Sequence, residues 1–182
     1  MDNKDLTALW LLPLATVSIQ VYAVDYLSAA ETQKIIFPEA NAFVDHKIHL
    51  TSEQKDRIKK LSGVRQRWDE QAVWRVEQDG MFKGWFIVDD VVGKHEFITY
   101  GLGLTPDGHV IGIEIMSYRE THGGEIMQEE WRDHFKGKTL NDKFKLDVDV
   151  PNISGATLSC RNVTDGIKRL LALQKVVLRD ER

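Results

Sequence analysis

From residue 72 to residue 116 the chain repeats one pattern, in which short segments rich in β-branched and aromatic residues are separated by turn residues. Residues 72–76 alternate between faces, and residues 85–88 form an uninterrupted apolar run after a turn at Gly80. Segments of this length and composition predict β-strands. Because strands joined by short turns pair antiparallel, this part of the chain constrains the fold to an antiparallel sheet.

The strongest turn signal is Pro106-Asp107-Gly108, which lies between predicted strands at residues 97–104 and 110–116. Pro, Asp and Gly are typical turn residues, so these two strands are expected to form a hairpin. Alternate residues of the second strand should point to opposite faces of a sheet that is packed on one face. The two sets are Ile111, Ile113 and Ile115 on one face, and Gly112, Glu114 and Met116 on the other.

Helices are predicted before this strand region. Ser28-Ala29-Ala30-Glu31 has the Ser-x-x-Glu form of a capping box, which predicts a short helix ending before Pro38. Residues 51–63 predict a second, charged helix that begins with a capping Thr and ends at a Gly. Its apolar positions, Ile58 and Leu61, should face inward.

A third helix is predicted over residues 160–178, with Val163 and Ile167 on an apolar side that closes the core. Lys168 and Arg169 lie two or more turns beyond the helix start, where solvent exposure is favoured over contact with a phosphate. The predicted fold class is therefore α+β, a twisted antiparallel sheet with flanking helices.

The composition fits a single globular domain, because 42% of the 182 residues are hydrophobic and 29% are charged. The net charge of -4 and intermixed acids and bases provide no basic stripe, which argues against nucleic acid as a partner. One cysteine, Cys160, excludes an intramolecular disulfide, a Cys-rich zinc site, a cysteine-ligated iron–sulfur cluster and a c-type haem motif. Its position near a helix start favours a small buried residue over a reactive thiol.

The first 23 residues stand apart from the rest. Residues 6–23 are mostly apolar and end in Val21-Tyr22-Ala23, which is typical of a signal peptide with a small-residue cleavage site. Retention as a membrane anchor is the alternative, and an N-terminal buried helix is a third. We therefore expect a signal peptide or anchor at 1–23, a helical N-terminal part at 24–70 and a core at 71–182.

Near the C-terminus, Ser154-Gly155-Ala156-Thr157 precedes Leu158, Ser159 and a helical pattern. The small residues leave room for a bulky planar group, Thr157 offers a hydroxyl, and the N–H groups at a helix N-terminus favour a phosphate. Simple helix capping is the other interpretation.

A second candidate segment runs from Arg119 to Gly124. Gly123 and Gly124 allow the backbone to approach a ligand closely, and Glu120 and Thr121 can form hydrogen bonds with the polar edge of a flat ring. The alternative is a long glycine-hinged turn.

The order of these features resembles the FMN-binding domain of RnfG-like and NqrC-like electron-transfer subunits. The resemblance is carried by motifs that cover the last ninety residues. These motifs are Gly93-Lys94-His95-Glu96-Phe97-Ile98, the strand ending in Asp107-Gly108, the stretch from Tyr118 to Ile126, the stretch from Trp131 to Lys138, and Ser154-Gly155-Ala156-Thr157-Leu158-Ser159.

The resemblance implies that Thr157 receives FMN through a phosphoester bond made by a flavin transferase. It also implies that Glu120 and Thr121, with His122, Gly123 and Gly124, lie against the isoalloxazine ring. The sequence departs from the transferase motif at one position: Pro151 stands three residues before Ser154, where the motif has Asp, and the nearest acid is Asp149.

The function that follows is a periplasmic or otherwise extracytoplasmic flavoprotein, exported free or anchored to the membrane by its N-terminal segment. It is expected to relay electrons between redox partner proteins such as cytochromes or membrane electron-transfer subunits. Two alternatives remain open, a noncovalent FMN-binding or sensory module and a cofactor-free assembly subunit. No residue is assigned as a catalytic acid or base, since the flavin supplies the redox chemistry.

Three further features have packing as an alternative explanation. His46 and His49 lack partners at a recognised metal-ligand spacing, so no metal site is assigned. His95 can orient a cofactor or a partner, although surface or core packing is an equal explanation. Trp131 fits an amphipathic helix, with a wall of the flavin pocket as the alternative.

Overall fold

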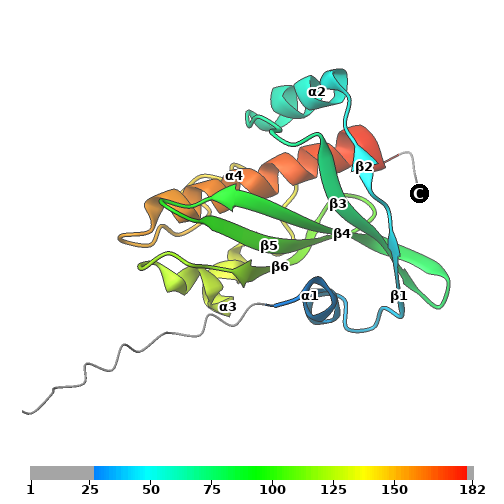
Figure 1. The fold of residues 1–182 in the computed structure, drawn as a ribbon, viewed down its shortest axis with the longest axis horizontal. Helices are drawn as coiled ribbons and strands as arrows, with labels where there is room; N and C mark the ends of the chain where they lie inside the picture. Colours follow the sequence, from blue (N-terminus) through cyan, green and yellow to red (C-terminus); the bar gives the residue numbers. More distant parts are fainter. Residues whose placement is uncertain (1–26, 180–182) are drawn as a thin grey trace, which may run out of the picture.

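The computed structural model describes residues 27–179 (Figure 1). The predicted signal peptide or anchor at residues 1–23 lies outside this range. Within it, no helix combines the length and the apolar character that crossing a bilayer requires.

The structure confirms the α+β class, with one antiparallel sheet and helices packed on it. Within the described residues the sheet has six strands in the order β1-β3-β4-β5-β6, and β2 pairs with β3 at the same side as β1. The elements in chain order are α1 (Ala29–Ile36), β1 (Ala42–Asp45), β2 (Ile48–His49), α2 (Ser52–Ser62), β3 (Glu70–Gln78), β4 (Met81–Val92), β5 (Phe97–Leu104), β6 (Val110–Ser117), η1 (Gly124–Met127), α3 (Glu129–Arg132), η2 (Asp133–Phe135), α4 (Thr157–Leu173) and η3 (Gln174–Leu178).

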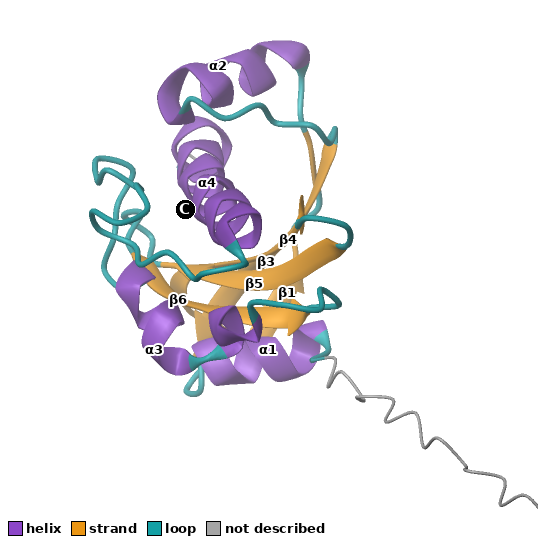
Figure 2. Ribbon diagram, turned by 90° about the vertical axis from the view of Figure 1, so that its left-hand side faces the viewer, coloured by secondary structure: helices purple, strands orange, loops and turns teal. Residues whose placement is uncertain are grey.

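The sheet separates two apolar layers. Figure 2 shows α4 on one face of the sheet and α1 on the other, with α2 packed on the outer side of α4. In β4, Trp85 and Ile87 join the large core under α4, whereas Phe86 between them joins the smaller core under α1. This alternation is the period of two that a strand imposes on a sheet covered on both faces.

The helix-start predictions are confirmed for α1 and α2. Ser28 and Glu31 form a reciprocal capping box, in which Glu31 Oε2 accepts from Ser28 N at 2.8 Å. Thr51 forms the same arrangement at α2, and Gly63 ends that helix with a left-handed φ of 78°. Leu61 was expected to face inward, but it is 42% exposed because only Ile58 of this helix reaches the core under α4.

Helix α1 lies directly against two glycines of β5. A Cβ on Gly101 would overlap Thr32, and a Cβ on Gly103 would overlap Ile36. Gly101-Leu102-Gly103 therefore serves the packing of a helix on a strand, which explains glycines inside a strand without a nucleotide loop.

The predicted facing of β6 is wrong at Ile111. Leu104 pairs with Val110 and Gly103 pairs with Gly112, so one extra residue is inserted at Ile111. This β-bulge turns Ile111 toward the core under α1, while Ile113 remains in the core under α4.

The prediction that Arg169 is exposed to solvent is also wrong. Its side chain is 4% exposed and lies in α4 against the sheet, where Nη2 donates to Asp89 Oδ2 in β4 and Nη1 donates to Gln66 Oε1. Tyr100 in β5 donates to the same Asp89 oxygen at 2.7 Å. Ionic and hydrogen-bonded contacts thus join α4, β4 and β5 inside the core.

Replacing Arg169 with Met should lower the free energy of unfolding by about 3–5 kcal/mol, because it leaves the Asp89 carboxylate buried without its counter-ion. Denaturant unfolding followed by circular dichroism measures the change. The matched control is Lys55→Met, which removes the more exposed pair with Asp69 and should cost at most about 1 kcal/mol. Equal losses in the two variants would contradict a special role for the buried pair.

Candidate functional site

Three segments that are distant in sequence meet at one pocket of about 270 Å³. They are the turn between β4 and β5, the loop that follows β6, and the first turn of α4. The lining residues are Lys94 and His95 from the turn, Glu120, Thr121 and His122 from the loop, and Gly155, Ala156, Thr157, Leu158 and Ser159 from α4 and the residues before it.

The Ser-Gly-Ala-Thr motif forms a tight turn into α4. Ala156 N donates to Ile153 O at 3.0 Å, and Gly155, at the third position of this turn, has a φ of 81° that glycine adopts without strain. Ala156 is the N-cap residue, and no side chain caps the helix. The capping interpretation of Ser154 and Thr157 is therefore wrong.

Without a side-chain cap, the first turn of α4 presents backbone N–H groups that have no acceptor within the helix. The first helical N–H bond is that of Cys160, which donates to Ala156 O at 2.9 Å. Thr157 is the first residue of the helix and partly exposed, so its hydroxyl stands beside these donors at the wall of the pocket.

The loop after β6 touches the start of α4 at Gly123. A Cβ on Gly123 would overlap the Cβ of Ala156, and Gly123 has a φ of 85°. The small size of both residues thus allows two backbone segments to pack together. Ala156 is buried in this contact, which gives its small side chain a packing role.

Glu120 fastens the loop to the β4–β5 turn. Its Oε1 accepts from His95 N at 2.6 Å and from Glu96 N at 3.0 Å. Gly93 lies under this carboxylate, because a Cβ there would overlap the same oxygen. Although desolvation acts to raise the pKa of Glu120, the backbone N–H groups of Glu96, His95 and Lys94 outweigh it and lower the pKa from its ordinary value of 4.5.

Eight of the eleven residues predicted for the site line this pocket, and three do not. Ser154 is exposed in the turn before α4, Gly123 packs on Ala156, and Gly124 begins η1. Thr157 also lines a second, neighbouring pocket of about 370 Å³. It shares that pocket with Lys145 and Arg161, among others.

The structure adds residues to which the sequence assigned no role. Lys94 lines the pocket, and Tyr118 lies buried behind the loop with its hydroxyl donating to His122 O. Tyr118 lies two residues beyond the predicted strand at residues 110–116 and directly follows β6, so a buried aromatic side chain fits the end of that apolar pattern. The bond made by its hydroxyl was not, because it depends on how the loop folds back.

The other sequence candidates belong to the packing. Trp131 does not line the pocket; it stacks edge-on against Phe135 at 5.0 Å, and its Nε1 donates to Pro151 O at 2.9 Å. Cys160 is fully buried, and burial raises the pKa of its thiol. Within residues 27–179 no group of three or more His, Cys, Asp or Glu side chains could hold a metal ion, His46 and His49 included.

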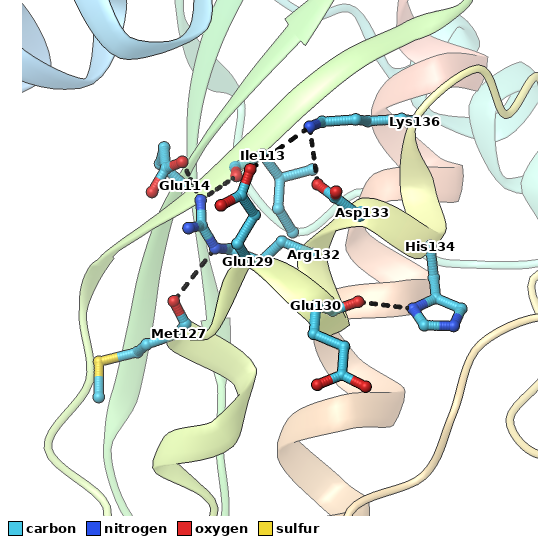
Figure 3. A network of polar contacts seen from close by, with 9 residues as sticks. All are labelled: Ile113, Glu114, Met127, Glu129, Glu130, Arg132, Asp133, His134 and Lys136. Atoms are coloured by element: carbon cyan, nitrogen blue, oxygen red, sulfur yellow. Dashed lines mark hydrogen bonds and ion pairs between the residues drawn. The ribbon is translucent and has the colours of Figure 1, made fainter.

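The segment that continues from the loop is anchored to β6 by Arg132. Its Nε donates to Met127 O at 3.1 Å, and its Nη1 donates to Ile113 O at 3.0 Å and forms an ion pair with Glu114 (Figure 3). Lys136, which follows η2, adds an ion pair with Asp133 at 2.7 Å. Arg132 therefore holds residues 124–136 against β6, next to the loop.

Residues 93–172 match the family model of the FMN-binding domain. All three segments around the pocket lie within the matched residues. The uncapped helix start, the Thr157 hydroxyl and the polar loop fit a cofactor that has a phosphate at one end and a polar planar ring at the other.

Two solved structures are similar to this chain in fold. The chain is similar to the crystal structure of NqrC from Shewanella oneidensis, with a TM-score of 0.53 and 17% sequence identity over 79% of this chain and 87% of that chain. A second similar structure is a subunit of the Na⁺-translocating NADH-quinone reductase from Parabacteroides distasonis, with a TM-score of 0.49, 15% identity, and coverage of 73% of this chain and 77% of that chain. No curated protein sequence matches the chain.

Replacing Glu120 with Gln should destabilise the protein at neutral pH by roughly 1 kcal/mol. The substitution removes the charge from a hydrogen bond that partial exposure to solvent already weakens. Because folding lowers the pKa of Glu120, its contribution is present above about pH 4.5 and is lost as the pH falls through the folded-state pKa. The difference between the wild type and Glu120→Gln in free energy of unfolding should therefore vanish at low pH.

Unfolding curves recorded from pH 7 to pH 3 test this, with Glu96→Gln as the control. Glu96 is exposed on the same turn and takes part in the Glu120 contact only through its backbone N–H. A pH-independent difference for Glu120→Gln would contradict the assignment.

Proposed function

We propose that the protein carries FMN on Thr157 through a phosphoester bond and relays electrons between redox partner proteins outside the cytoplasm. The observation that supports this most directly is the position of the Thr157 hydroxyl. It stands at the first residue of an α4 that has no side-chain cap, in the wall of the pocket built by the FMN-binding domain.

The attachment step is a substitution at phosphorus. Thr157 Oγ1 bonds to the flavin phosphate of a flavin dinucleotide supplied by a flavin transferase, the second nucleotide leaves with the electron pair of the broken P–O bond, and the hydroxyl proton is released. The backbone N–H groups of the first turn of α4 and the positive end of the helix dipole stabilise the negative charge of the resulting phosphodiester.

The remaining lining residues would hold the ring. Thr121 and the backbone of the loop offer hydrogen-bonding groups to its polar edge, while Leu158 offers an apolar contact. Lys94 places a cation in the same wall. When bound, the isoalloxazine accepts and donates electrons, and the protein sets its orientation and exposure to water.

The partners and the location belong to the proposal as well. The fold is similar to that of NqrC, and the motifs resemble those of NqrC-like electron-transfer subunits, which favours membrane electron-transfer subunits or cytochromes as partners. The signal-like sequence of residues 1–23 supports export, and a covalent bond would prevent loss of FMN by dilution outside the cytoplasm.

Noncovalent FMN binding is the second candidate function, because of the departure at Pro151. The nearest acid, Asp149, is engaged in the structure, where its carboxylate binds Lys138 Nζ at 2.9 Å and Lys145 N at 2.7 Å. A sensory module that binds FMN reversibly would use the same pocket without modification of Thr157.

Full-length protein produced with a flavin transferase should gain the mass of one FMN phosphodiester, located on the Thr157 peptide by mass spectrometry. Thr157→Ala should abolish the addition, whereas Ser154→Ala should retain it, because Ser154 lies in the same motif but outside the pocket. An unmodified wild type that binds FMN reversibly would favour the second candidate. A colourless wild type with no affinity for FMN would leave the cofactor-free assembly subunit.

A further inference from the structure

We propose that the Tyr118 hydroxyl is a positioning group that holds residues 119–124 against the start of α4, so that the pocket is formed before FMN arrives. The inference rests on the proposed function only in assigning FMN to this pocket. Nothing in the motif resemblance gave Tyr118 a role.

The Tyr118 hydroxyl lies where the loop and α4 meet. Its proton goes to the carbonyl of His122, since a carbonyl oxygen can only accept. The Ser159 Oγ in the first turn of α4 lies 3.5 Å from the same hydroxyl, at the limit of a hydrogen bond. One side chain thus contacts the tip of the loop and the helix that carries Thr157.

The close packing of Gly123 on Ala156 makes the position of the loop sensitive to the Tyr118 hydroxyl. A Cβ on Gly123 would lie 2.9 Å from Tyr118 Oη and would also overlap Ala156, so Gly123 is in close contact with both residues. If the bond to His122 O were lost, the loop could move away from Ala156. His122 and Thr121, which line the pocket, would move with it.

The start of the loop has a separate restraint. Glu120 holds it to the β4–β5 turn through the N–H groups of His95 and Glu96. Tyr118 acts on the part from His122 to Gly123, where Ile126 N also donates to Gly123 O at 3.2 Å. The two restraints act on opposite sides of Thr121, which is exposed and can face a ligand.

Tyr118 remains protonated under physiological conditions. Desolvation raises its pKa above the ordinary value of 10.0, and the nearby Glu120 carboxylate also raises it, although Ser159 acts in the opposite direction. The hydroxyl therefore retains the proton that it donates to His122 O.

The test uses reversible FMN binding in full-length Thr157→Ala protein, where no covalent bond masks the affinity. Adding Tyr118→Phe removes one hydroxyl and keeps the buried ring. The dissociation constant of FMN, measured by quenching of flavin fluorescence, should rise about fivefold, the effect of losing one hydrogen bond. An unchanged dissociation constant would overturn the proposal.

The matched control is Tyr100→Phe in the same background. Tyr100 is a buried tyrosine whose hydroxyl donates to Asp89 Oδ2 at 2.7 Å, inside the core and away from the pocket. Its loss should lower the melting temperature but leave the FMN dissociation constant within about twofold. An equal rise in the two variants would mean that general destabilisation weakens binding, which also overturns the proposal.

A second measurement separates this inference from the proposed function. In the protein without FMN, amide hydrogen exchange at residues 121–124 should be several times faster in Tyr118→Phe than in the wild type, while exchange in β4 is unchanged. If FMN does not bind the Thr157→Ala protein reversibly, exchange still decides the role of Tyr118, while the mass of the Thr157 peptide decides the proposed function separately. Equal exchange at residues 121–124 would refute it.

Discussion

The position of Thr157 depends on how α4 is fixed to the sheet, and the buried pair of Arg169 and Asp89 fixes it. Apolar packing alone would allow a helix to slide or rotate on a sheet, because such contacts have little directional preference. An ion pair surrounded by apolar side chains accepts one geometry, since any shift would leave a charge without its partner. Gln66 accepts a further hydrogen bond from Arg169, and the ion pair joins α4 to β4.

From that fixed helix the pocket is assembled by local contacts. The turn at Gly155 brings the chain into α4 at a sharp angle, and the uncapped first turn faces the loop after β6. Gly123 allows the loop to reach Ala156, and Glu120 ties it to the β4–β5 turn. The site therefore combines a rigid helix with two short segments whose positions depend on a few polar bonds.

Local sequence signals predicted the fold well wherever the cause was local. The capping boxes at Ser28 and Thr51 and the hairpin around Asp107 depend on residues within one turn of each other, and the structure confirms them. Arg169 and Ile111 were misplaced because their causes are distant. Asp89 lies eighty residues from Arg169, and the bulge at Ile111 exists only once β6 has paired with β5.

The candidate site was also predicted only in part. The motif resemblance identified most of the residues that line the pocket, but not the contacts of Tyr118 and Gly93 that hold them together. Such contacts form only after three separate segments converge, so no spacing in the sequence encodes them, and the roles of the lining residues toward FMN stay predictions.

The polar bonds that hold the loop and the turn are made to main-chain atoms, namely the amides of His95 and Glu96 and the carbonyl of His122. Every amino acid except proline offers the amide, and all offer the carbonyl. These bonds, which help to shape the pocket, therefore do not depend on which side chains occupy these positions. A substitution at residue 95 or 122 can therefore change the charge beside the pocket while the main-chain bonds that shape it are kept.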